Sequence, residues 1–356
     1  MENQQKTAIK KQLKGMTLQE LQEYFIEIGE PKFRGEQVFH WMYNRLSQNI
    51  DDMNNIPKAL RIKLNESASI SAMEFVDKEV SAGTGTTKFV FKTNEGNLIE
   101  SVVIPEEKRT TLCLSTQVGC PLDCQFCATG LMGYKRNLHS GEIFDQFMLA
   151  QKLYGKDITN IVYMGMGEPL LNFQNTVKSL SIFSEELTTG ISLKKVTVST
   201  SGIAPRIIEL ADMNLKVKLA LSLHSCFEET RSRIMPVNKK YSLKQTIAAV
   251  KYYAQKTGTR ITFEYVMLKG INDGEADIKA LTKIAKEIPS KINLIPFNSL
   301  KHMNPTGFAA ELVPSAKEHI HIFADKLRAK DISVFLRETQ GNDIAAACGQ
   351  LAVKHS

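Results

Sequence analysis

The chain has 356 residues, which is long enough for two domains or for one large α/β domain with an addition. Its hydrophobic fraction of 43% and charged fraction of 23% exclude a fibrous or wholly disordered protein, and six cysteines are too few for a disulfide scaffold. The net charge of +7 is compatible with a nucleic-acid partner, although many enzymes carry a similar charge. The polar N-terminus has no apolar signal core, and no segment approaches a span of about 18 apolar residues. We therefore expect a cytoplasmic protein that does not enter a membrane.

Residues 1–70 predict an N-terminal helical accessory domain. Thr17 and Glu20 have the spacing of a capping box at the start of an amphipathic run through Ile28. Two further helical runs follow, at 35–46 and 57–66.

Residues 71–105 have the period-two pattern of strands and predict a short β-hairpin extension. Strands at 86–93 and 97–104 flank the turn Asn94-Glu95-Gly96. The change of pattern near residue 105 marks the start of a third unit, residues 106–356.

The third unit alternates strands with helices. Strands are predicted at 110–116, 157–164, 194–199, 216–222, 260–267 and 291–296. The helical stretches between them include 140–153, 174–186, 243–256 and 275–287. Six β–α units in succession predict a parallel sheet with right-handed crossovers, and six are too few for a closed eight-stranded barrel. The expected fold is therefore α/β, an open six-stranded partial (β/α) barrel, followed by one more helix at 315–327 and a strand at 332–337.

Three cysteines, Cys120, Cys124 and Cys127, lie within eight residues after the first barrel strand. Thiolates bind soft metals, and such short spacings let one loop surround one centre. A four-iron cluster held by three cysteines keeps one iron open to chelate S-adenosylmethionine. The alternative is a structural zinc site with Cys113 as fourth ligand, but zinc sites usually use paired C-x2-C motifs that are distant in sequence.

The chain resembles the radical S-adenosylmethionine enzymes, and more narrowly the bacterial adenine-C2 methyltransferases of ribosomal and transfer RNA. The motifs that carry this resemblance are Cys113-Leu-Ser-Thr-Gln-Val-Gly-Cys120, Cys127-Ala-Thr-Gly130, Gly165-Met-Gly-Glu-Pro169, Ser222-Leu-His224 and Asp343-Ile-Ala-Ala-Ala-Cys-Gly-Gln350. The match runs from about residue 100 to residue 351, while the N-terminal helices resemble the family only loosely. The resemblance implies a radical S-adenosylmethionine fold, a [4Fe-4S] cluster on Cys120, Cys124 and Cys127, and two S-adenosylmethionine molecules per turnover.

Polar groups follow several of the predicted strands and suit a bound nucleoside. Glu168 stands beside two glycines at the end of the second strand, where a carboxylate can accept hydrogen bonds from an ammonium group. A simple strand–helix turn is the alternative there, and each of the other groups taken alone could be an ordinary loop residue. The resemblance implies that the residues binding S-adenosylmethionine are Gly167, Glu168, Ser199, Ser222, Leu223, His224 and Asn298.

The resemblance also assigns three catalytic residues. Adenine C2 is electron-poor, so a methyl group cannot be placed on it by simple displacement, whereas a cysteine thiolate can accept the methyl group first. Cys348 is the implied methyl carrier. A deoxyadenosyl radical then abstracts hydrogen from its S-methyl group, and the resulting carbon radical joins the protein to the RNA. Cys113 is the implied resolving thiol that forms a transient disulfide, and Glu100 is the implied general base at C2. A buried apolar role is the alternative for Cys113, and it is the role expected for Cys226.

The implied partners are 23S ribosomal RNA, transfer RNA and a reducing protein such as flavodoxin or ferredoxin, and a monomer is expected. The target adenine must leave its stack to be reached. Candidate phosphate contacts are Lys135, Arg136, Arg231 and Arg233.

Three other functions compete with this interpretation. The related adenine-C8 methyltransferases, which confer antibiotic resistance, share both catalytic cysteines and the cluster motif. A radical methylthiotransferase needs three more cysteines for a second cluster, and only the dispersed Cys113, Cys226 and Cys348 remain. A zinc-containing RNA-binding module is the non-enzymatic alternative.

Overall fold

The computed structural model describes residues 10–188 and 190–353. An N-terminal lobe contains three helices, α1 (Leu18–Glu27), α2 (Lys32–Tyr43) and α3 (Lys58–Ser67). Two short parallel strands, β1 (Lys11–Gln12) and β2 (Ala68–Ser69), join the beginning of the lobe to its end. The predicted capping box at α1 is confirmed, because Thr17 and Glu20 each accept from the other's backbone N–H. Helix α2 begins three residues earlier than predicted, directly after Pro31.

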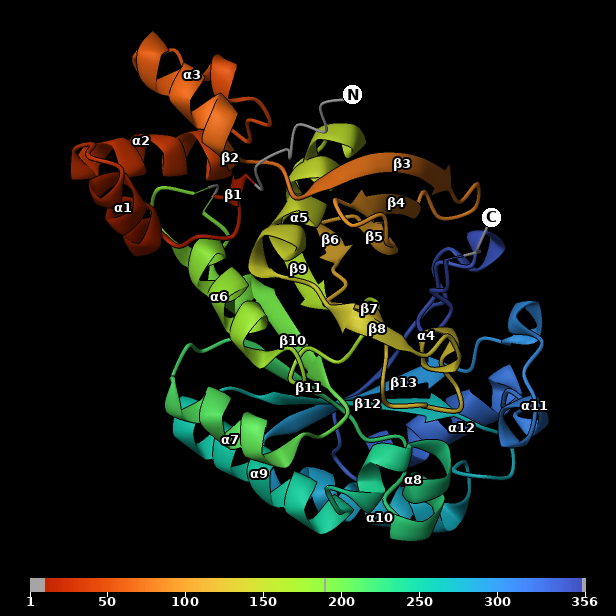
Figure 1. Ribbon diagram of the computed structural model, residues 1–356. Coiled ribbons are helices and arrows are strands. Elements are labelled where there is room, and N and C mark those ends of the chain that lie inside the picture. Colours follow the sequence, from red (N-terminus) through yellow and green to blue (C-terminus); the bar gives the residue numbers. More distant parts are fainter. Residues whose placement is uncertain (1–9, 189, 354–356) are drawn as a thin grey trace.

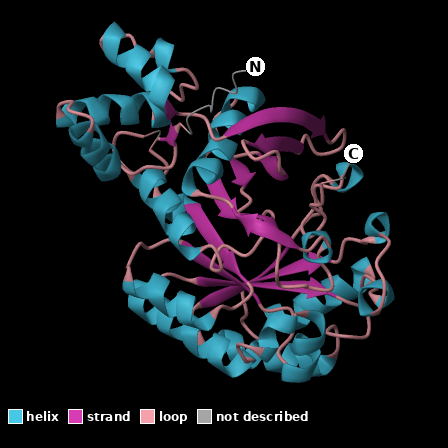
Figure 2. Ribbon diagram, viewed as in Figure 1, coloured by secondary structure: helices cyan, strands magenta, loops and turns pink. Residues whose placement is uncertain are grey.

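One sheet of ten strands runs through the rest of the molecule (Figures 1 and 2). Its order is β14-β13-β12-β11-β10-β9-β6-β5-β4-β3. The antiparallel strands are β3 (Met73–Val80), β4 (Thr87–Thr93) and β5 (Leu98–Glu106), and β5 pairs with β6 (Arg109–Cys113). From β6 onward the strands are parallel: β9 (Asn160–Tyr163), β10 (Val196–Thr200), β11 (Lys218–Ser222), β12 (Ile261–Met267), β13 (Ser290–Pro296) and β14 (Val334–Leu336).

The predicted open α/β barrel is confirmed, with two additions. The strand predicted at 332–337 pairs with β13 as a seventh parallel strand, because the helix before it returns the chain to that edge. The β-extension also contains a strand, β3, that the sequence pattern did not predict. Since Val102 pairs with Cys113, the extension continues the parallel sheet at its other edge.

Helices lie along the outer side of the parallel strands, as Figure 1 shows. These helices are α5 (Ser140–Tyr154), α6 (Phe173–Ser184), α7 (Ala204–Asp212), α8 (Glu228–Ile234), α9 (Leu243–Thr257), α10 (Glu275–Glu287) and α12 (Lys317–Arg328). A small hairpin of β7 (Gln117–Gly119) and β8 (Tyr134–Asn137) interrupts the first β–α unit, with the short helix α4 (Ala128–Leu131) between its strands. Another short helix, α11 (Phe308–Glu311), precedes α12. No helix in the described ranges is long and apolar enough to cross a membrane.

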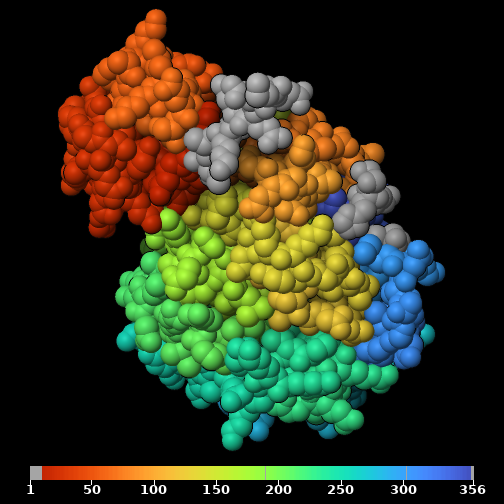
Figure 3. Space-filling model, in the orientation of Figure 1, coloured from red at the N-terminus to blue at the C-terminus, as the bar shows by residue number. Residues whose placement is uncertain are grey.

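A buried ion pair fastens the N-terminal lobe, which projects from the barrel in Figure 3. Lys14 Nζ lies 3.2 Å from Asp145 Oδ1 on α5, and neither side chain is exposed. Asp145 Oδ2 also accepts the N–H groups of Ala72 and Met73, at the start of β3. The Lys14 ammonium group faces the rings of Tyr43 and Phe144. One charged pair thus joins the first described segment, the lobe, β3 and α5.

Candidate active site

A cavity opens at the carboxyl ends of the parallel strands and encloses about 1060 Å³, counting its mouth. That is enough space for a cofactor and a nucleoside. Ten of the thirteen predicted site residues line it: Cys120, Cys124, Cys127, Gly167, Glu168, Ser199, Ser222, His224, Asn298 and Cys348. The structure does not place Cys113, Glu100 or Leu223 in this wall.

The loop with the three cysteines is folded tightly by its glycines. Gly119, just before Cys120, has φ +75°, and a Cβ there would lie 1.9 Å from the carbonyl oxygen of Gly133. A Cβ on Gly130 would lie 2.9 Å from the backbone nitrogen of Cys124. Cys127 donates its N–H to the Cys124 carbonyl at 3.1 Å and forms the N-cap of α4. Hairpin, loop and helix together hold three thiols on one wall of the cavity.

The three thiols line the cavity together, which suits a cluster of several irons. No three His, Cys, Asp or Glu side chains in the described part of the chain are grouped so that they could hold one metal ion. A single zinc ion needs every thiolate within about 2.3 Å of one point. In a cluster each thiolate binds its own iron, so the thiols surround a volume. Burial raises the pKa of Cys120 to about 12, and the nearby Cys127 adds to the effect.

Glu168 is buried beneath the cavity wall and held by backbone groups. Its Oε2 accepts from the N–H of Ser201 at 2.7 Å, and its Oε1 accepts from the N–H of Leu170 at 3.0 Å. Burial raises the pKa of this carboxyl, and the two N–H groups partly oppose that rise. The position thus offers a fixed carboxylate to the cavity.

Gly165 and Gly167, the two glycines beside Glu168, are explained by packing contacts that the sequence did not reveal. A Cβ on Gly167 would lie 2.5 Å from the Gln117 side chain, and one on Gly165 would lie 2.7 Å from the Leu114 carbonyl oxygen. Both glycines are required by the packing of the β9 end against the chain that follows β6. Their presence alone therefore does not indicate a ligand.

His224 lines the cavity in an unusual backbone conformation. Its φ is +55°, its Nδ1 accepts from the N–H of Val266 at 3.0 Å, and its ring packs edge-on against Phe126. Burial lowers the pKa of this imidazole to about 3, so the ring is neutral near pH 7. Leu223, one residue earlier, is fully buried behind the wall.

The prediction that Arg231 contacts phosphate is wrong. Its side chain is completely buried, and its guanidinium donates to the carbonyls of Ser201, Ser222 and Leu223 and to Asn238 Oδ1. Arg231 instead fixes the ends of β10 and β11, which carry Ser199 and Ser222. Its neighbouring candidate, Arg233, is exposed and stacks on the Phe308 ring.

The other two candidates lie near the hairpin. Arg136 is ion-paired with Glu142 and Glu95, so its charge is already compensated. Lys135 is exposed and borders a second, smaller cavity beside β7. Of the predicted phosphate contacts, Lys135 and Arg233 are the exposed ones, and Arg233 also pairs with Glu311 at 3.4 Å.

The segment with Cys348 is joined to the cysteine loop by two hydrogen bonds. Ala128 donates its N–H to the Gly349 carbonyl at 2.7 Å, and Thr129 Oγ1 donates to the Leu351 carbonyl at 2.6 Å. A third bond, from Asn298 Nδ2 to the carbonyl of Cys348 itself, measures 3.0 Å. Cys348 is accessible from the cavity, although the surrounding protein raises the pKa of its thiol to about 11.

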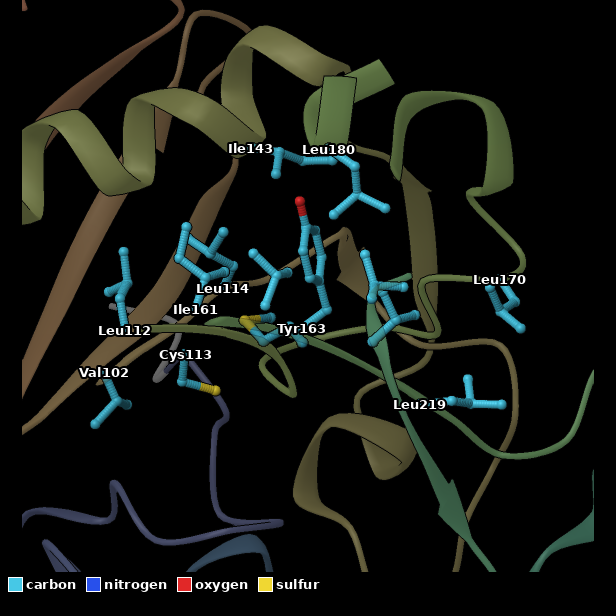
Figure 4. Packing of buried hydrophobic residues seen from close by; sticks show 14 of the residues in the cluster. Val102, Leu112, Cys113, Leu114, Ile143, Ile161, Tyr163, Leu170, Leu180 and Leu219 are labelled. Atoms are coloured by element: carbon cyan, nitrogen blue, oxygen red, sulfur yellow. The ribbon is translucent and has the colours of Figure 1, made fainter. Parts of the chain in front are cut away.

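Cys113 and Glu100 are not among the residues that line the cavity, and they lie on β6 and β5. Figure 4 shows the Cys113 side chain on the same side of the sheet as Val102, its partner on β5, and on the opposite side from Leu112 and Tyr163. Burial raises the pKa of Cys113 to about 12, and the charge of the nearby Cys348 contributes to that rise. Glu100 Oε1 lies 3.6 Å from Lys88 Nζ, and burial raises the pKa of this carboxyl while Lys88 lowers it.

Sequence reasoning missed two charged residues of the cavity wall, Glu264 and Arg337. Glu264 is 5% exposed, and its Oε1 accepts from Asn293 Nδ2 at 2.9 Å. The signal was available, because Glu264 is the one charged residue in the apolar strand β12, whose residues are all buried. Arg337 follows β14, and nothing in its local sequence distinguishes it from a solvated arginine.

Comparison with known protein families agrees with the family resemblance that the sequence motifs carry. Residues 11–70 match a family model described as the ribosomal RNA large subunit methyltransferase N-terminal domain, and residues 114–281 match the radical SAM superfamily. The N-terminal resemblance is thus more specific than the sequence motifs indicated.

Relatives align over nearly the full length of the chain. A protein of Thermotoga sp. (strain RQ2), named "Probable dual-specificity RNA methyltransferase RlmN", is 43% identical and covers 97% of this chain and 98% of its own. One of the same name from Clostridioides difficile (strain 630) is 42% identical, covering 96% and 98%. The crystal structure of a radical SAM methyltransferase from Sphaerobacter thermophilus superposes with a TM-score of 0.89 at 40% identity, covering 96% and 99%. The chain therefore belongs to the RlmN family of radical SAM RNA methyltransferases.

Proposed function

We propose that this protein methylates C2 of a specific adenine in 23S ribosomal RNA and in transfer RNA, in the cytoplasm. The observation that carries the proposal is the placement of Cys348 in the wall of the cavity that also holds Cys120, Cys124 and Cys127. A methyl carrier beside a radical source is what methylation of an electron-poor carbon requires. The names of the relatives and their near-complete coverage support RNA as the substrate.

In the proposed site Cys120, Cys124 and Cys127 hold a [4Fe-4S] cluster, and Glu168 contacts the amino group of S-adenosylmethionine. The other residues proposed to bind that cofactor are Gly167, Ser199, Ser222, His224 and Asn298, with Leu223 supporting them from behind. When bound, the cluster and S-adenosylmethionine supply a 5′-deoxyadenosyl radical by one-electron cleavage of the sulfonium. Two S-adenosylmethionine molecules are used per turnover, one as methyl donor and one as radical source.

Cys348 first accepts the methyl group as a thiolate, and an S–C bond forms as the sulfonium S–C bond breaks. The 5′-deoxyadenosyl radical would take a hydrogen atom from this methyl group and become 5′-deoxyadenosine. The carbon radical left on Cys348 would add to adenine C2 and join the protein to RNA. Glu100 would then take the C2 proton, and the bound cluster would serve as the acceptor for one electron from the adduct. The thiolate of Cys113 attacks the Cys348 sulfur, the C–S bond breaks, and the product carbon takes up a proton. The resulting disulfide must be reduced by an external thiol before the next turnover.

The alternative is methylation at C8, which the same residues could carry out if the adenine were presented differently. Mass spectrometry of nucleosides from RNA treated with the protein separates the two. We expect 2-methyladenosine as the main product, and 8-methyladenosine as the main product would reject the C2 assignment. Reduction by a flavodoxin or ferredoxin and a monomeric state are further parts of this proposal.

A further inference from the structure

Lys88, on β4, joins three parts of the molecule that are distant in sequence. Its side chain is 10% exposed, and its Nζ donates to the carbonyl of Ile344 at 2.7 Å. The same nitrogen lies 2.9 Å from Glu79 Oε2 on β3 and 3.6 Å from Glu100 Oε1 on β5. One ammonium group thus contacts two strands and the segment that carries Cys348.

The contacts of Lys88 and Glu100 fall on both sides of Cys348. Ile344 precedes Cys348 by four residues, and the N–H of Ala352, four residues after it, approaches the Glu100 carboxylate. The segment between these two points contains the proposed methyl carrier. Moving either side chain would therefore remove one of the contacts that hold that segment.

Glu100 also keeps one oxygen free. Its Oε2 is buried and has no hydrogen-bond partner in the described residues. Lys88 holds the other oxygen, and the charged groups facing this carboxylate are Lys88 and, more distantly, Glu79. A buried carboxylate with a neighbouring cation and a free lone pair is suited to accept a proton.

We propose that Lys88 is a positioning residue for RNA methylation: its ammonium group fixes the Glu100 carboxylate and the Cys348 segment in one arrangement. This inference rests on the roles proposed above for Glu100 and Cys348. Lys88 itself need not touch RNA or cofactor. Its effect is expected on the steps that follow radical formation.

The test uses the full-length, cluster-loaded protein as Lys88→Met, Lys88→Arg and the control Lys92→Met. Lys92 lies four residues further along β4. Its side chain is 46% exposed and pairs with Glu74, away from Glu100 and Ile344. For each variant we would measure methylated adenosine formed per 5′-deoxyadenosine released, the protein–RNA adduct, and kcat against pH. Thermal unfolding shows whether each variant is folded.

For Lys88→Met we expect about a tenfold fall in methylated adenosine per 5′-deoxyadenosine, because the buried charged contact is lost. The limb of the pH profile that reports deprotonation of Glu100 should move to higher pH, since the neighbouring cation is gone. Lys88→Arg should restore most of the ratio, and Lys92→Met should match the wild type. A wild-type ratio and pH profile in Lys88→Met would overturn the proposal, as would an equal loss of 5′-deoxyadenosine and methylation. Failure of the proposed function is distinct, because the wild type itself would then yield no methylated adenosine.

Discussion

Ala128 and Gly349 are joined by a backbone hydrogen bond of 2.7 Å, although 221 residues separate them in the chain. Each residue directly follows a cysteine of the cavity wall, Cys127 and Cys348. This bond therefore sets the distance between the proposed radical source and the proposed methyl carrier. Gly349 is suited to its place because its φ is +80° and a Cβ would lie 3.0 Å from the Phe126 carbonyl oxygen.

Weakening the second bond between these segments should uncouple radical formation from methylation. In Thr129→Val the Leu351 carbonyl loses its buried donor, at a cost of about 1–2 kcal/mol. We expect methylated adenosine per 5′-deoxyadenosine to fall by roughly tenfold. The control is Thr282→Val, which removes one comparable bond, from Thr282 Oγ1 to the Ile278 carbonyl within α10. An unchanged ratio in Thr129→Val would show that this bond does not position Cys348.

Replacing each of the two proposed catalytic cysteines should block the reaction at a different step. Cys348→Ala should abolish methyl transfer to RNA while still releasing 5′-deoxyadenosine, because the three thiols proposed to hold the cluster are intact. Cys113→Ala should accumulate a covalent protein–RNA adduct, seen as a shifted band that nuclease digestion collapses. Cys226→Ala is the control, since Cys226 is half-buried outside the cavity wall and should methylate RNA normally. Absence of an adduct in Cys113→Ala argues against its resolving role.

The buried Lys14–Asp145 pair should dominate the stability of the junction with the N-terminal lobe. Lys14→Met leaves Asp145 charged and buried without its cation, which costs about 3–5 kcal/mol. Lys11→Met, three residues earlier at an exposed position, should change the free energy of unfolding by less than about 0.5 kcal/mol. Urea unfolding followed by circular dichroism measures both. Equal stabilities of the two variants would contradict this account of the junction.

Acid should destabilise the protein through His224. Its pKa is about 3 when folded and about 6.5 when unfolded, so below pH 6.5 the unfolded state binds the extra proton. The free energy of unfolding should therefore fall by up to about 1.4 kcal/mol for each pH unit from 6.5 towards 3. His224→Asn can keep the positive φ and accept from Val266 without titrating. The two proteins should diverge between pH 7 and 5 in urea unfolding, whereas parallel curves would show that His224 is not the group responsible.

Local patterns predicted most of the fold, and long-range packing accounts for what they missed. Strands β9 to β13 are apolar runs bounded by turns, so they could be read directly from the sequence. Strand β3 could not, because seven of its eight residues are exposed and four of the eight are charged. The pairing of β14 with β13 depends on where α12 returns the chain, which no local signal encodes.

The site residues likewise fall into those that local motifs predict and those that only long-range packing explains. Cysteine spacing and strand-end motifs identified the residues of the cavity wall, because neighbouring parallel strands bring their carboxyl ends together. Arg231 was misjudged because residue type does not reveal burial, and only the fold gives its guanidinium four protein acceptors. The contact of Lys88 with Ile344 joins residues 256 positions apart, and nothing in the sequence of either segment predicts it.

The most direct test of the central claim is analysis of protein purified without oxygen. If Cys120, Cys124 and Cys127 hold a cluster that cleaves S-adenosylmethionine, the protein should be brown and contain about four iron and four sulfide per chain. It should also release 5′-deoxyadenosine when given strong reductant and S-adenosylmethionine, and the triple variant with alanine at these three positions should do neither. Colourless wild-type protein with stoichiometric zinc and no 5′-deoxyadenosine would contradict the account.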